Sequence, residues 1–170
     1  MTWGIPTTIF LQMHVFLSLA AIAIGFAAVW GIARGRHLAG WVAAFLVTTF
    51  LTGVTGFPLA PFGMTPGRII GVILICALIA ASASLYVFAL AGANRSLYVI
   101  TSVLALYLNV FVAIVQAFQK IGPLNALAPT QTELPFALTQ AAALVLFIVL
   151  GVLGHRRFQP SSSVSAASPA

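Results

Sequence analysis

Few side chains in this sequence of 170 residues could act as acids, bases or nucleophiles. Asp is absent and Glu133 is the only glutamate, so catalysis by a pair of carboxylates is excluded. No GxSxG or HExxH motif occurs, and the single cysteine, Cys76, can form neither an intramolecular disulfide nor a CxxC metal site. The residues left for proton transfer or ligand binding are the three histidines, Lys120 and Glu133.

His14 is unusual because it lies inside a long apolar run, FLQMHVFLSLAAIAIGFAAVW. Three interpretations are open. A neutral imidazole has one donor and one acceptor nitrogen, so it can hold two helices together by a hydrogen bond. It can also contact a ligand or carry a proton in a pocket, or serve as an axial ligand of haem or copper.

The spacing of the histidines gives haem and metal binding no support. Two histidines bind one haem only from facing helices at one depth, and His37 and His155 are expected at the opposite membrane face from His14. A retinal protein would need a lysine near the mid-plane, and the only lysine is at a helix end. We predict no catalytic residue, no metal site and no cofactor.

The elements that must position these residues are transmembrane helices. The chain is 62% hydrophobic and only 5% charged, whereas soluble domains have about 25% charged residues. Five apolar runs reach the about 20 residues that a helix needs to cross a bilayer. The sequence therefore predicts an all-α, single-domain membrane bundle over residues 1–158, with a disordered tail at 159–170. The five predicted helices span residues 8–33, 41–58, 68–91, 97–119 and 135–154.

The net charge of +6 indicates topology rather than nucleic-acid binding, because the basic residues stand at the ends of the apolar runs. Alternating threading puts five arginines on one side and Arg68, Lys120 and Glu133 on the other. The positive-inside rule then predicts the N-terminus outside and the C-terminus in the cytoplasm. The five arginines are Arg34, Arg36, Arg95, Arg156 and Arg157.

Polar side chains of four predicted helices fall on the faces that carry small residues, which are expected to face other helices. With this threading they lie in the outer half of the membrane, apart from Asn109 near the mid-plane. We predict a ligand pocket built from His14, Thr52, Thr55, Asn109, Gln116 and Gln140. Lys120 and Glu133 flank one loop at the same membrane face, and we predict that they form a surface ion pair or a gate.

The stretch LALYLNVFVAIVQAFQKIGPLNALAPTQTELPF, residues 104–136, resembles a group of short bacterial inner-membrane proteins with five helices and no assigned activity. HVFLSLAAIAIGF and TGVTGFPLAPF are similar to that group as well, so the likeness covers most of residues 10–158. The resemblance implies a bacterial inner membrane and assigns no chemistry to any residue.

These features favour a non-enzymatic binding or accessory protein. Its pocket would receive a small lipophilic molecule or the helix of a membrane partner. Two alternatives stay open: a redox or proton-handling membrane enzyme subunit that uses quinone or haem, and a small transporter.

Overall fold

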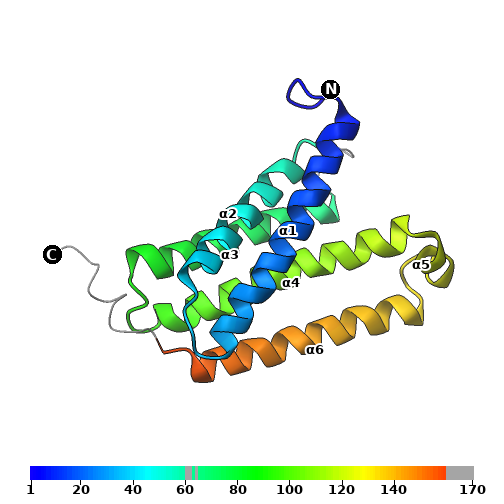
Figure 1. Cartoon of the computed structure of the whole chain (residues 1–170). Coiled ribbons are helices and arrows are strands. Elements are labelled where there is room, and N and C mark those ends of the chain that lie inside the picture. Colours follow the sequence, from blue (N-terminus) through cyan, green and yellow to red (C-terminus); the bar gives the residue numbers. More distant parts are fainter. Residues whose placement is uncertain (60–62, 64, 160–170) are drawn as a thin grey trace.

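The computed structural model describes residues 1–59, 63 and 65–159, and over these residues it is helical without a strand (Figure 1). Five helices are long and apolar enough to cross a membrane, which confirms the predicted all-α, multi-pass architecture. A short additional helix, α5 (Gly122–Leu127), joins the fourth span to the fifth. The spans are α1 (Thr7–Ala33), α2 (Ala39–Gly56), α3 (Pro66–Ser82) with its π-helical continuation η1 (Ala83–Val87), α4 (Asn94–Lys120) and α6 (Leu134–Arg157).

The helix boundaries differ from the predicted ones by up to four residues, the largest difference being the end of the third span, predicted at 91 and observed at Val87. The prediction began the fourth helix at residue 97 and ended the fifth at 154, but α4 includes Arg95 and α6 continues to Arg157. Basic side chains are stabilising in the last turn of a helix, where the carbonyl groups concentrate negative charge. This accounts for the extension of α6 but not for that of α4, in which Arg95 lies in the first turn. The predicted tail at 159–170 lies outside the described residues except for residue 159.

Because successive spans are antiparallel, the bundle has two chemically different ends. We call one the basic end: α1 and α6 finish there, α2 and α4 begin there, and it carries the five arginines of the predicted inner side. The other, which we call the proline-rich end, holds the start of α1, the end of α2 and α5. The orientation of these ends in the membrane stays a prediction.

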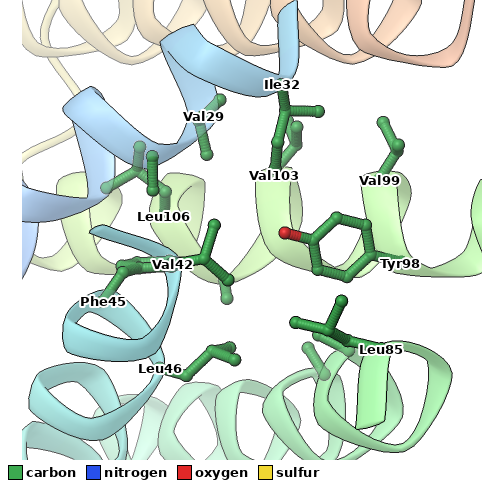
Figure 2. Close-up of a cluster of buried hydrophobic side chains, with 14 of the residues drawn as sticks. Val29, Ile32, Val42, Phe45, Leu46, Leu85, Tyr98, Val99, Val103 and Leu106 are labelled. Atoms are coloured by element: carbon green, nitrogen blue, oxygen red, sulfur yellow. The ribbon is translucent and has the colours of Figure 1, made fainter. Parts of the chain in front are cut away.

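Tight packing is concentrated in the half of the bundle nearer the basic end. Figure 2 shows the core of this half, where Val29 of α1, Val42 of α2 and Tyr98 of α4 converge. Gly25 lets α1 approach both neighbours, since a Cβ there would lie 2.6 Å from Leu106 Cδ1 and 2.7 Å from Phe45 Cε2. Such close approach of backbones is the main source of helix association in lipid.

The basic end is closed by an aromatic junction, which we define as His37, Tyr98 and Phe158. The His37 ring meets Tyr98 and Phe158 edge-on, with centroids 6.3 Å and 6.2 Å away, and Tyr98 and Phe158 are themselves 5.5 Å apart. Arg95 Nη1 donates a hydrogen bond of 2.7 Å to the Phe158 carbonyl oxygen. The junction therefore ties the α1–α2 connection, the start of α4 and the end of α6 together.

Gly35 brings the α1–α2 connection against the end of α6. Its φ is +76°, and a Cβ there would lie 2.7 Å from the carbonyl oxygen of Arg157. Gly35→Ala should lower the free energy of unfolding, since a left-handed conformation alone costs an ordinary residue about 1–2 kcal/mol and the clash is with backbone. Gly40→Ala is the matched control, because a Cβ at Gly40 meets nothing within 4 Å. Thermal unfolding in detergent checks this, and equal midpoints for the two variants would contradict the packing.

The aromatic junction should also make stability depend on pH. Burial lowers the pKa of His37 below 6.5, its Nε2 has no hydrogen-bond partner in the described part of the chain, and the only Asp or Glu side chain, Glu133, begins α6 at the other end. Between its unfolded and its lower folded pKa the unfolded chain binds more protons, so stability decreases as the pH falls through that window.

The midpoint of wild-type unfolding should therefore drop between about pH 7 and about pH 5, and drop less in His37→Phe, which keeps the ring contacts. His155→Gln changes an exposed histidine at the same end and should retain the wild-type pH dependence. Parallel pH profiles for wild type and His37→Phe would exclude His37 as the cause.

Candidate functional site

Towards the proline-rich end the bundle separates into two arms. The first arm consists of the proline-rich halves of α1 and α2 with the start of α3, and the second of the corresponding half of α4 with α5 and of α6. The separation lies between α1 and the helices α4 and α6, because α3 packs against both α2 and α4. Figure 1 shows α1 diverging from α4 and α6 in this direction. The burial of side chains is consistent with this divergence. Phe10 is the only buried residue of α1 before Ala21, and α6 has no buried residue before Phe147.

Each arm is held together by its own contacts. In the first arm, Arg68 of α3 donates hydrogen bonds to the carbonyl oxygens of Gly63 and Phe57, at 2.7 Å and 2.8 Å. In the second, the rings of Phe118 and Phe136 meet edge-on at 5.4 Å. We call the region between the two arms the seam.

One hydrogen bond joins His14 of α1 to α2 within the first arm. Its Nδ1 lies 2.9 Å from Thr55 Oγ1 of α2, and the Thr55 hydroxyl donates its own proton to the carbonyl oxygen of Leu51 at 2.7 Å. A hydroxyl has one proton, so Thr55 accepts from His14 and Nδ1 is the protonated nitrogen. In the neutral ring this leaves Nε2 as a hydrogen-bond acceptor.

Nε2 of His14 is the atom of this region that is best placed to meet a ligand. It has no hydrogen-bond partner among the described residues, and it is not buried. The half-buried ring is accommodated beside α2 by Gly56, where a Cβ would lie only 3.4 Å from His14 Cε1. Gly56 was not among the predicted site residues, although a small residue next to Thr55 was the available signal.

Two further predicted site residues lie on the second arm, on α4 and α6. Asn109 is 7% exposed, and its Nδ2 has no partner in the described part of the chain. Gln140 of α6 donates from Nε2 to the carbonyl oxygen of Phe111 at 3.2 Å, while its Oε1 is buried without a partner there. A buried amide normally satisfies these groups, so both residues retain hydrogen-bonding capacity.

The other predicted residues contribute in different ways. Thr52 is buried and its hydroxyl donates back to the Thr48 carbonyl oxygen at 2.9 Å, so its polarity is satisfied within α2. Gln116 is exposed on the second arm. Lys120, the last residue of α4, is near enough to His14 for the two to interact electrostatically.

The carboxylate of Glu133 bonds to its own loop rather than to Lys120. It accepts hydrogen bonds from the backbone nitrogens of Thr130 and Thr132, at 3.1 Å and 3.0 Å, and from the Thr130 hydroxyl at 2.8 Å. Desolvation opposes its ionisation, but these bonds outweigh that effect and lower the pKa of the Glu133 carboxyl. Glu133 therefore stabilises the loop that leads into α6. Lys120 forms no ion pair with it, and its positive charge lies near His14.

The polar side chains of this region can donate and accept hydrogen bonds. Across the described residues, no three of His, Cys, Asp or Glu gather where they could hold a metal ion. Comparisons of the chain with protein families, curated proteins and solved structures find no match. The function therefore has to be inferred from the geometry of the seam.

The His14–Thr55 bond can be tested by a double-mutant cycle. His14→Ala combined with Thr55→Val should give a coupling energy of about 0.6–1.7 kcal/mol, the range found for hydrogen bonds between membrane helices. The control pair is His14→Ala with Thr48→Val, because the Thr48 hydroxyl donates only within α2, to Ala44 and Phe45. Unfolding in a denaturing detergent supplies the free energies. Equal coupling in both cycles would show that the interhelical bond does not form.

Proposed function

We propose that this protein is a non-enzymatic binding protein of the membrane, which takes up a small lipophilic molecule at the seam between its two arms. The ligand would carry a hydrogen-bond donor, such as a hydroxyl group, at its polar end. The observation on which the proposal depends is the accessible Nε2 of His14, fixed as an acceptor by the bond from Nδ1 to Thr55. The finer assignment, to a bacterial inner membrane with the site in the outer leaflet, is part of this proposal.

Two further features of the seam support this ligand class. Asn109 Nδ2 and Gln140 Oε1, on the second arm, are buried without a partner among the described residues, and in this proposal a polar group that enters between the arms satisfies them. The first three turns of α1 are largely exposed apart from Phe10, so apolar surface is available beside His14 for the body of the ligand. Binding would then bring the two arms together by bridging polar groups that do not reach each other.

A matched pair of probes tests the proposed hydrogen bond. 4-Octylphenol has a hydroxyl donor, and its methyl ether, 4-octylanisole, has the same body without the donor. The phenol should raise the unfolding midpoint of the detergent-solubilised protein by about 2–4 °C for each kcal/mol of binding free energy, and the ether should raise it much less. His14→Phe should remove the difference between the probes.

Gln12→Phe is the control, because it introduces the same ring two residues away at an exposed position of α1. It should respond to both probes as wild type does. Equal shifts for phenol and ether in wild type, or a difference that survives His14→Phe, would overturn the proposal. A visible absorption band that wild type retains and His14→Phe loses would support the redox alternative instead.

A further inference from the structure

A second site lies on another face of the bundle, between α2 and the helix formed by α3 and η1. A groove of about 590 Å³ runs along this face. Its walls are apolar apart from Ser82 and Tyr86, and Ala43 and Ala83 provide small side chains along it. Wall residues such as Val47 (58% exposed) and Ile79 (61% exposed) face outward, so within a bilayer the groove is open to lipid.

The π-helical segment η1 forms one end of this groove. Ala83, Tyr86 and Val87 belong to it, and it ends in a turn in which Ala89 and Leu90 have φ values of 46° and 60°. The turn is retained because Leu90 is buried and its nitrogen donates to the Ser84 carbonyl oxygen at 2.9 Å. Segments of π-helix and strained residues are common at functional sites.

The length of the groove and its position along the span indicate what fills it. On α2 the lining extends from Ala43, one turn inside the basic end, to Leu51, which is about 12 Å at 1.5 Å per residue. One leaflet of the hydrocarbon core is about 15 Å thick. The groove therefore has nearly the length of one leaflet, which suits an acyl chain.

The charge at the basic end indicates which lipid would be preferred. Arg36 is exposed in the connection that leads directly into α2, and no Asp or Glu lies at this end. The Tyr86 ring, 64% exposed, lies at the same end of the groove, at the level where aromatic side chains commonly meet lipid headgroups. A phosphate group at this end of the groove would thus be attracted by the positive charge of the basic end, and the Tyr86 hydroxyl could donate a hydrogen bond to it.

We propose that this groove binds one acyl chain of an anionic phospholipid, with the headgroup at the basic end near Arg36. This lipid site is separate from the seam that contains His14. Its role would be to fill the space between α2 and η1, so that the strained turn after η1 stays packed.

Native mass spectrometry of the delipidated protein tests the proposal, with dioleoylphosphatidylglycerol and dioleoylphosphatidylcholine as the added probes. Wild type should retain one phosphatidylglycerol at lower lipid concentration than phosphatidylcholine. Ala43→Phe, which fills the groove at an exposed position, should lose the single retained lipid. Ala141→Phe, the same change on an exposed face of α6, should bind as wild type does.

The charge is tested separately. Arg36→Gln should weaken phosphatidylglycerol binding about fivefold, as expected for one basic residue near a lipid surface, while Arg156→Gln, an exposed arginine at the same end on α6, should not.

Should Ala43→Phe fail to fold, Val47→Trp fills the same groove from its exposed wall. Equal retention of both lipids by wild type, unchanged retention in the filled groove, or a dimer that Ala43→Phe dissociates would each overturn the proposal.

Discussion

In a bilayer, two helices gain little by hiding apolar surface from their surroundings, because lipid tails are as apolar as leucine. The only Asp or Glu of this chain, Glu133, lies just before α6 and bonds to its own loop, so no ion pair with an Asp or Glu side chain joins its spans and the helices depend on close contact. That contact is provided at Gly25, against Phe45 and Leu106, and at Gly154, where a Cβ would lie 2.9 Å from Val99 Cγ1. Both positions are in the half nearer the basic end, and the separation of the two arms at the other end follows from this distribution.

The polar chemistry of the protein follows the same division. In the packed half the basic end is closed by aromatic rings and one hydrogen bond from Arg95. In the open half each arm satisfies most of its polar groups internally, as Thr55 and His14 do. Buried polar atoms without a partner among the described residues occur in both halves, as with His37 Nε2 at the basic end and Gln140 Oε1 on the second arm. The two halves therefore differ in how their helices are joined rather than in whether all their polar groups are satisfied.

Hydropathy was sufficient to predict the spans, because a helix that crosses lipid must be long and apolar and must satisfy its own backbone. It could not predict η1, since a π-turn leaves the hydropathy of a span unchanged. Stepping by three and four placed His14 and Gln116 on inward faces. His14 does meet a neighbouring helix, but Gln116 is exposed because the arms have diverged at its level. Divergence is a tertiary property that the periodicity of one helix does not contain.

The distribution of charge along the bundle has a consequence for its movements. Arginine and lysine occur only at the ends of the described spans or in the connections, as with Arg68 near the start of α3 and Lys120 at the end of α4. A membrane potential does work only on charge that moves through it, about 2.3 kcal/mol per elementary charge for each 100 mV. Movements of the two arms would carry no arginine or lysine through the field, so their equilibrium should respond to bound molecules and to lipid composition but hardly to voltage.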